Sequence, residues 1–431
     1  MNQNARSKPV DVVVVGMGAR AMIYAQETLR HPEMLHIVGV ADVNPQAVRL
    51  ARDTFGIPEE RCFSSSEALA SVPRFAQGAI NGTMDPQHVS TTLPLLRRGY
   101  DVLLEKPFAL DQYQADLLLS CARETGRRVM ICHVLRYASF YRRLKELIVS
   151  GELGHIINIQ MTEQVSYFHE SVSYIRGKYA SPEICGSGML LSKCCHDLDI
   201  MAWLMAPNHP ACVTSLGSVF QFRPEMAPSG AGSHCLLDCP IQRECHYSAR
   251  HLYLEYPQRW ANNIWHDCGH EGASEEEKLH LLSDPANPYS RCVYRCDLRI
   301  VDHQSVMIGF SDGATGTFCM NGGATASSRT IHLTGTKGEA AGCFEDDRLT
   351  VSLISPQAPG GRQVRVENLT PAKRGAAHGG GDQALVMDFV ALLRGEKPSL
   401  CSTTLEDSIT GHRLVFLAED SRRQNGEMLA F

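Results

Sequence analysis

The chain has 431 residues, of which 44% are hydrophobic and 20% charged, and its formal net charge is −6. This length predicts two or three domains. The proportion of hydrophobic to charged residues is typical of a globular protein with a large core. The acidic charge argues against a nucleic-acid partner, which needs a basic face. No apolar run approaches the roughly 18 residues that span a bilayer, and the N-terminus lacks a signal-peptide layout. We therefore expect a cytoplasmic protein with neither a nucleic-acid nor a membrane partner.

The first third of the chain alternates apolar runs with amphipathic stretches. The runs are typical of strands buried on both faces, and they cover residues 10–15, 37–41, 78–81, 101–104 and 129–133. Helical patterns lie between them, for example at 47–54 and 89–98. This alternation predicts a doubly wound parallel α/β sheet of the Rossmann type. We assign residues 1–135 to this domain.

The pattern changes after residue 135. Strand-like runs follow one another with few helices between them, at 156–163, 214–222, 305–310, 314–320, 330–333 and 349–354. They predict an α+β domain over residues 136–375, with a large, mainly antiparallel open sheet. Residues 224–297 interrupt the strands and form a predicted cysteine-rich insertion. Residues 376–431 carry two helical patterns, which we expect to pack back near the domain interface.

A glycine motif follows the first predicted strand. The Gly-x-Gly-x-x-Ala pattern provides a tight turn, close backbone approach to a pyrophosphate and a small residue for helix packing. Asp42 ends the second strand, where a carboxylate binds the ribose hydroxyls and favours NAD over NADP. The alternative is a glycine turn in a domain that binds no nucleotide. The predicted cofactor contacts are Gly16, Gly18, Ala19, Arg20, Ala21, Asp42, Thr83, His88, Glu105 and Lys106.

Two further motifs complete a recognisable set. Glu105-Lys106-Pro107 follows a predicted strand, and the glycine-rich segment 186–199 contains His196 and ends at Asp199. In this order the motifs resemble the Gfo/Idh/MocA family of glucose–fructose oxidoreductase and inositol dehydrogenase. The resemblance implies a two-domain, NAD-dependent oxidoreductase acting on a hydroxyl of a sugar or polyol. It also implies a homodimer or homotetramer.

The predicted catalytic residues are Lys106, His196 and Lys193. A desolvated lysine can have its pKa lowered towards neutrality and act as an acid or base. A histidine titrates near pH 6.5, which suits proton exchange. On one helix, Lys193, His196 and Asp199 would share a face, so that Asp199 would orient the imidazole. The alternatives are a surface lysine before a proline turn and a buried structural histidine.

The chain departs from the family pattern at one position. Many dehydrogenase members place an Asp four residues before the histidine, and this chain has Ser192 there. A hydroxyl cannot supply the carboxylate's charge, so a Lys–Asp–His proton relay is in question. Two alternatives to a dehydrogenase stay open. One is a glycosidase that oxidises its substrate, eliminates the aglycone, adds water and reduces the ring again with the same NAD. The other is a non-catalytic protein that binds NAD and a sugar.

Several further residues are candidates for substrate contacts. Guanidinium groups bind carboxylates or sulfonates through paired hydrogen bonds, but internal salt bridges explain buried arginines equally well. The substrate candidates are Arg136, Tyr137, His169, Arg176, His303 and His378.

The insertion concentrates cysteines. Four thiolates in a tetrahedron suit a structural zinc ion, and the predicted ligands are Cys235, Cys239, Cys245 and Cys292, with Cys296 in reserve. The alternative is a set of free buried cysteines, which are common because the side chain is small and apolar.

Overall fold

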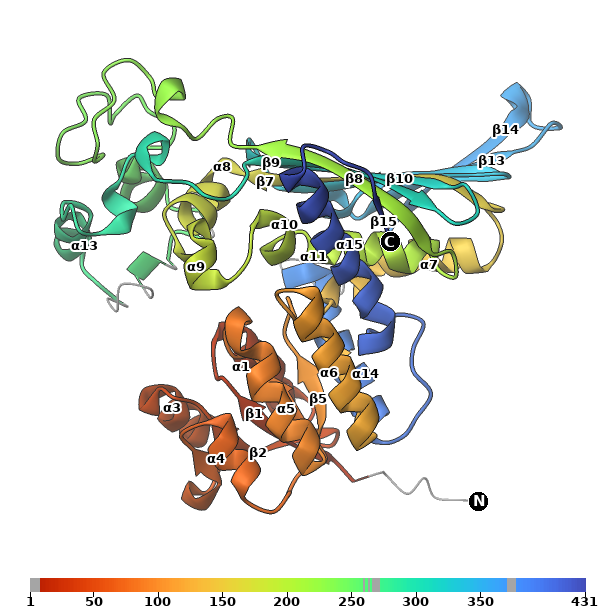
Figure 1. Cartoon of the computed structure of the whole chain (residues 1–431), viewed down its shortest axis with the longest axis horizontal. Coiled ribbons are helices and arrows are strands. Elements are labelled where there is room, and N and C mark those ends of the chain that lie inside the picture. Colours follow the sequence, from red (N-terminus) through yellow and green to blue (C-terminus); the bar gives the residue numbers. More distant parts are fainter. Residues whose placement is uncertain (1–7, 259, 263, 266–271, 370–376) are drawn as a thin grey trace.

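The computed structural model describes residues 8–258, 260–262, 264–265, 272–369 and 377–431. The N-terminal domain contains a six-stranded parallel sheet in the order β3-β2-β1-β4-β5-β6 (Figure 1). Its strands are β1 (Val10–Val15), β2 (Leu35–Ala41), β3 (Cys62–Phe63), β4 (Gly78–Asn81), β5 (Asp101–Leu104) and β6 (Val129–Ile131). The Rossmann-type sheet predicted from the apolar runs is therefore confirmed.

Helices cover both faces of this sheet. They are α1 (Ala19–Ala25), α2 (Glu27–Arg30), α3 (Pro45–Phe55), α4 (Ser66–Ser71), α5 (His88–Arg98) and α6 (Gln112–Thr125). Local sequence sets their ends: α3 begins after Asn44, whose side chain accepts a hydrogen bond from the Gln46 amide, and ends at Gly56 in the left-handed region. Side chains of α4, α5 and α6 pack on one face of the sheet, and those of α1 and α3 on the other.

The second domain contains a nine-stranded sheet in the order β14-β13-β12-β11-β7-β10-β9-β8-β15. Only β7 (Ile156–Ser166) and β10 (Thr315–Ala324) pair in parallel, so the predicted mainly antiparallel sheet is confirmed. The other strands are β8 (Pro210–Ser218), β9 (His303–Phe310), β11 (Ser328–Gly335), β12 (Gly338–Cys343), β13 (Arg348–Ile354), β14 (Arg362–Asn368) and β15 (Leu429–Ala430).

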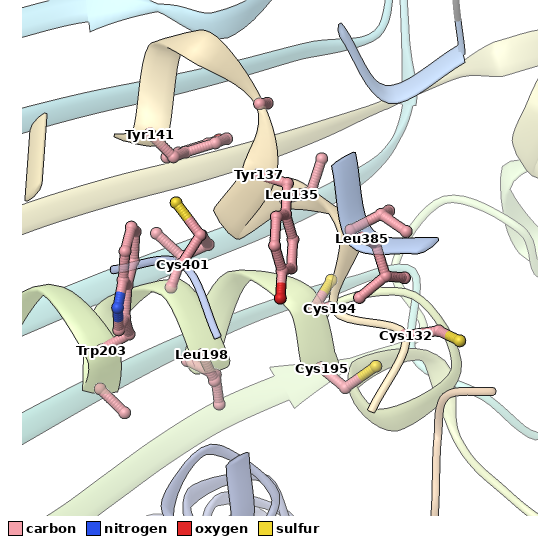
Figure 2. Close-up of a cluster of buried hydrophobic side chains, with 14 of the residues drawn as sticks. Cys132, Leu135, Tyr137, Tyr141, Cys194, Cys195, Leu198, Trp203, Leu385 and Cys401 are labelled. Carbon is pink, nitrogen blue, oxygen red and sulfur yellow. The ribbon is translucent and has the colours of Figure 1, made fainter. Parts of the chain in front are cut away.

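One face of the large sheet packs against helices. The helices of this part of the chain are α7 (Ser139–Val149), α8 (Tyr167–His169), α9 (Pro182–Cys185), α10 (Met189–Ser192), α11 (Cys195–Met205), α13 (Glu275–Leu282), α14 (Gly381–Leu393) and α15 (Leu405–Arg423). Figure 2 shows part of the resulting core, where Leu198 and Trp203 of α11 gather with Tyr137, Tyr141 and Leu385. The α11 helix is buried along its whole length, as expected for a helix between two layers.

The C-terminal helices join the two domains. Side chains of α14 belong to the same core as α1 and one face of the parallel sheet, and a Cβ atom on Gly78 of β4 would lie 2.9 Å from Leu393. The end of the chain therefore completes the N-terminal domain. The domain boundary expected between residues 375 and 376 lies outside the described residues.

Two differences from the predicted strands have local causes. The strand predicted at 214–222 ends at Ser218, because the amides of Phe220, Gln221 and Phe222 donate instead to the carboxylate of Asp302. The strand β14 was missed because it is a polar edge strand with little apolar signal. In the part of the chain that the structure describes, no helix has the length and apolarity to cross a membrane.

Candidate functional site

The glycine turn after β1 has the shape that a pyrophosphate requires. Gly16 has φ +75°, and a Cβ atom there would lie 2.6 Å from the backbone nitrogen of Thr83. At Gly18, by contrast, a Cβ atom would meet only the Gly82 carbonyl oxygen, at 3.9 Å. The turn is thus packed on one side by the backbone after β4 and open in front of α1. The open side fits a phosphate group that approaches the backbone closely.

Asp42 stands beside this turn. Its Oδ2 accepts a hydrogen bond from the Met17 amide at 2.6 Å, and its Oδ1 accepts one from the Asn44 amide at 2.7 Å. These bonds fix a half-buried carboxylate at the end of β2, and each oxygen keeps a lone pair for another donor. The glycine turn and this carboxylate together fit a dinucleotide.

Arg20 belongs to a partly buried ionic network. Its Nε donates to Glu105 Oε1 at 3.1 Å, and its Nη2 donates to Asp382. Tyr24 donates its hydroxyl proton to the same Glu105 oxygen, at 2.6 Å. Asp382 in turn lies 3.2 Å from Nδ1 of His378. Arg20 and Glu105, both predicted to contact the cofactor, therefore tie α1 to the end of β5 and to α14.

Thr83 and His88 follow β4 and brace the same edge of the sheet. The Thr83 hydroxyl donates to Asn81 Oδ1 at 2.9 Å. The buried ring of His88 lies between two carbonyl oxygens, at 2.9 Å from that of Thr83 and 2.7 Å from that of Pro107. These contacts hold the loops after β4 and β5 together, and the predicted contact of His88 with the cofactor stays a prediction.

Lys106 is held in place as a cation. Its Nζ donates to the Ser192 carbonyl oxygen at 3.1 Å, which links the end of β5 to the end of α10, just before α11 begins. Burial alone would lower the pKa of Lys106, but its neighbours raise that pKa above the usual value. They are Cys195, Tyr179, Glu105 and Asp85. The lowering that burial favours is therefore opposed, since two carboxylates lie near enough to favour the ammonium form.

We call Lys106, His196 and the titratable side chains around them the Lys106–His196 cluster. In this cluster His196 is the neutral partner of Lys106. Its side chain is buried on α11, and its ring centre lies 5.6 Å from that of His133 and 6.4 Å from that of His378. Burial, reinforced by the nearby cation Lys106, holds the pKa of His196 well below its usual value. A neutral imidazole is able to accept a proton. His378 is also kept neutral, since burial lowers its pKa despite the contact with Asp382.

Lys193 does not share a helix with His196. The α10 helix ends at Ser192 and α11 begins at Cys195. The Lys193 Nζ lies 3.1 Å from Glu163 Oε1 on β7. The other Glu163 oxygen lies 2.6 Å from Arg329, which also pairs with Asp197 at 2.9 Å. The predicted common face with Asp199 is therefore wrong, because the helix is interrupted at Lys193.

Arg136 and Asp199 form a buried ion pair. Arg136 Nε donates to Asp199 Oδ2 at 2.7 Å, and Nη2 donates to Oδ1 at 2.5 Å. The remaining donors of Arg136 bind the carbonyl oxygens of Ser402 and Asp407. Arg136 thus has a structural position and not the predicted substrate contact. The partner of Asp199 is this guanidinium and not the His196 imidazole.

The other predicted substrate residues are spread over the domain. Tyr137 donates to Asp388 of α14 at 2.7 Å, and His303 pairs with Asp302 at 2.9 Å. His169 stacks on Trp260 with ring centres 4.5 Å apart. Arg176 is buried inside the insertion. Of the six predicted residues, His378 lies beside His196, and Arg136 lies near His133.

The four predicted zinc ligands line one small pocket in the insertion, together with Arg176. The Arg176 guanidinium donates to Cys235 Sγ at 3.5 Å and to the Tyr247 carbonyl oxygen at 2.9 Å. Among the residues described, no three His, Cys, Asp or Glu side chains are placed to hold a metal ion. The Arg176 guanidinium beside Cys235 would repel a zinc ion. The structure therefore does not support the predicted zinc site. The arrangement fits the alternative of free buried cysteines.

Four residues of the cluster were not anticipated from the sequence. They are Asp85, Tyr179, Glu163 and Arg329. None stands in a motif with a recognisable spacing. Glu163 was predicted to end a strand, and only the pairing of β7 with β11, which sets it opposite Arg329, reveals its role.

Comparisons with known proteins agree with this geometry. Residues 10–133 match the model of an oxidoreductase family with an NAD-binding Rossmann fold. Residues 141–231 match the GFO/IDH/MocA C-terminal domain. The putative oxidoreductase YteT of Bacillus subtilis is 23% identical over 406 residues, which cover 88% of each chain. The inositol 2-dehydrogenase of Burkholderia lata is 24% identical over 46% of this chain and 56% of its own length.

Solved structures show the same fold. A levoglucosan dehydrogenase in complex with NADH superimposes with a TM-score of 0.70 at 17% identity, covering 98% of this chain and 99% of the other. An oxidoreductase from Agrobacterium radiobacter, in complex with NAD+, L-tartaric acid and magnesium, gives a TM-score of 0.67 at 14% identity, with 98% of each chain covered.

The position of Asp42 predicts the choice of dinucleotide. We expect Asp42→Ser to weaken NAD binding about 10- to 100-fold, because it removes a charged hydrogen-bond acceptor. The ratio of NADP to NAD affinity should rise, because the repulsion of a 2′-phosphate is lost. Calorimetric titration with both dinucleotides measures this. Asp53→Ser, at an exposed position on α3, is the control. An unchanged affinity of Asp42→Ser for NAD would remove Asp42 from the site.

The buried ion pair predicts a large effect on stability. We expect Arg136→Met to lower the free energy of unfolding by about 3–5 kcal/mol, because Asp199 would be left as an unpaired buried charge. Denaturant unfolding measures this, with the exposed Arg142→Met as control. A variant of normal stability with a raised KM would instead restore Arg136 as a substrate contact.

Proposed function

The chain belongs to the Gfo/Idh/MocA family of NAD-binding oxidoreductases, and from that premise we propose that it transfers hydride between NAD and a secondary hydroxyl of a sugar or glycoside. The observation that carries the proposal is a buried lysine whose surroundings raise its pKa, near a buried histidine whose surroundings lower its pKa. Lys106 binds the carbonyl oxygen of Ser192, the last residue of α10, and His196 lies on the next helix, α11. Oxidation of an alcohol needs both groups, a donor to the oxygen and an acceptor for its proton.

Lys106 and His196 have different roles in the proposed reaction. The dinucleotide, when bound, supplies the acceptor for the hydride. The Lys106 ammonium donates a hydrogen bond to the reacting oxygen and stabilises the negative charge that develops there. His196 accepts the hydroxyl proton. Burial and the neighbouring Lys106 favour this role, since both keep His196 unprotonated.

We propose that the substrate is uncharged. Apart from Lys106, whose ammonium we assign to the reacting oxygen, the described cations of this region have carboxylate partners: Lys193 pairs with Glu163, and Arg329 with Glu163 and Asp197. Arg20 pairs with Glu105 and Asp382. A carboxylate, sulfonate or phosphate on the substrate would have to displace one of these partners, at the cost of an unpaired buried charge.

A redox-neutral glycosidase is the second candidate. Ser192 lies where family dehydrogenases carry a carboxylate, and its hydroxyl donates to the Gly188 carbonyl oxygen at 3.0 Å. Glu170 is fully buried near Lys193, and burial raises its pKa to about 8. A carboxyl group with a raised pKa is the kind of acid that protonates a departing oxygen during aglycone elimination.

One assay separates these candidates. The protein is incubated with NAD and a panel of neutral sugars and their aryl glycosides, while NADH absorbance at about 340 nm and aglycone release are followed. We expect net NADH without cleavage for at least one neutral sugar. Lys106→Ala should lower turnover by at least about 100-fold while NAD still binds, and Lys337→Ala, at an exposed turn, should have no effect.

The other outcomes are equally informative. Aglycone release without net NADH, with deuterium taken up from solvent next to the oxidised carbon, would replace the dehydrogenase by the recycling glycosidase. NAD binding with neither signal would support a non-catalytic sensor. Normal turnover of Lys106→Ala would remove this lysine from the mechanism.

We also propose a homodimer or homotetramer. The face of the large sheet opposite the helices exposes apolar side chains, among them Leu216 and Met307. Such a face is a suitable surface for self-association. Light scattering should give a mass of two or four chains, and a monomer at micromolar concentration would contradict this.

A further inference from the structure

Three buried histidines meet at the base of the Lys106–His196 cluster. His133 follows β6, His196 lies on α11 and His412 lies on α15. The ring centre of His133 is 5.6 Å from that of His196 and 5.5 Å from that of His412, and both contacts are edge-on. Five nitrogen atoms of these rings are buried without a hydrogen-bond partner. Orphaned buried polar atoms are rare in folded proteins and call for an explanation.

The two nitrogens of His133 have different surroundings. Its Nε2 lies 3.7 Å from Asp199 Oδ1, a separation that a small ring movement or one water molecule closes. A carboxylate on this side selects the tautomer with the proton on Nε2. Nδ1 of His133 is then a lone-pair acceptor. Nδ1 of His196 is itself buried and unpartnered, and a neutral His196 needs an acceptor there if its other nitrogen is to receive a proton.

The two carboxylates of α11 already have partners. Asp199 is bound by Arg136, and Asp197 is bound by Arg329. Ser192 is turned towards Gly188. The charged or titratable groups around His133 are Arg136, Lys106, Asp199, His196 and His412, and those around His196 are Lys106, His133, His378 and Arg329. Burial, Arg136 and Lys106 hold the pKa of His133 well below its usual value, so His133 is neutral and keeps its acceptor.

We propose that His133, oriented by Asp199, is the positioning residue of the general base, accepting a hydrogen bond from Nδ1–H of His196. The series of contacts from Asp199 through His133 to His196 replaces a carboxylate next to the general base, His196. It fixes the His196 tautomer with its lone pair on Nε2, and it stabilises the imidazolium that forms when the hydroxyl proton arrives. This inference rests on the proposed function, since it assigns a role in the same reaction.

The test uses three variants of the full chain with NAD and the best substrate of the panel. His133→Leu cannot accept a hydrogen bond, and we expect kcat to fall about 10- to 100-fold with little change in KM. His133→Gln, which keeps an acceptor, should recover much of this loss. His412→Phe keeps an aromatic ring beside Phe108, whose ring centre is 3.9 Å from that of His412, and should behave as the unaltered protein.

The pH profile separates positioning from a purely structural role. His196 must be neutral to act, so kcat/KM falls as pH drops through its pKa. A hydrogen bond that favours the imidazolium raises that pKa, so His133→Leu should move the acid limb to lower pH. An unmoved limb, or a loss equal in His133→Leu and His412→Phe, would overturn the proposal.

A measurement without turnover keeps the inference separate from the proposed function. Nitrogen-15 spectra of histidine-labelled protein report the tautomer of each ring. We expect the proton on Nε2 of His133 and on Nδ1 of His196, with the His196 signal altered in His133→Leu. If these tautomers are found in a protein that turns over no sugar, the proposed hydride transfer is refuted but the positioning role of His133 is not. The opposite tautomers would refute the positioning alone.

Discussion

The ion pair between Arg20 and Glu105 connects the two halves of the site. Arg20 stands in the first turn of the helix after the glycine turn, and Glu105 immediately precedes Lys106. The same guanidinium reaches Asp382, which holds His378 beside His196. One cation therefore sets the positions of the cofactor turn, the lysine and the histidine cluster. Although burial would raise the pKa of Glu105, Arg20 and Lys106 keep it below the usual value, so the network stays ionic.

Burial explains how acid and base roles are divided between neighbouring residues. The same low-dielectric surroundings act on Lys106 and His196, but only Lys106 has carboxylates close by. The lysine therefore keeps its proton and the histidine does not. Acid–base sites typically contain two titratable groups whose pKa values are shifted in opposite directions by their surroundings. This division supports the proposal that His196 is the proton acceptor, a role for which the sequence alone left both residues as candidates.

The parts predicted well from the sequence depend on local patterns. The apolar runs gave the parallel strands, and the turn at Gly16 has the conformation that its motif requires. The arginines were harder to interpret, because their partners are distant in the sequence. Arg136 binds Asp199, 63 residues away, and Ser402, 266 residues away. No periodicity reveals such contacts, so a structural guanidinium and a substrate-binding one look alike.

The central claim is that the glycine turn, Lys106 and His196 form one site around a single dinucleotide. A crystal structure of the protein with NAD and an unreactive sugar analogue tests it most directly. The account predicts the pyrophosphate over Gly18, the adenosine ribose at Asp42, and the nicotinamide ring against a sugar hydroxyl that contacts both Lys106 and His196. A nicotinamide ring lying away from these two side chains, with the sugar bound elsewhere, would contradict it.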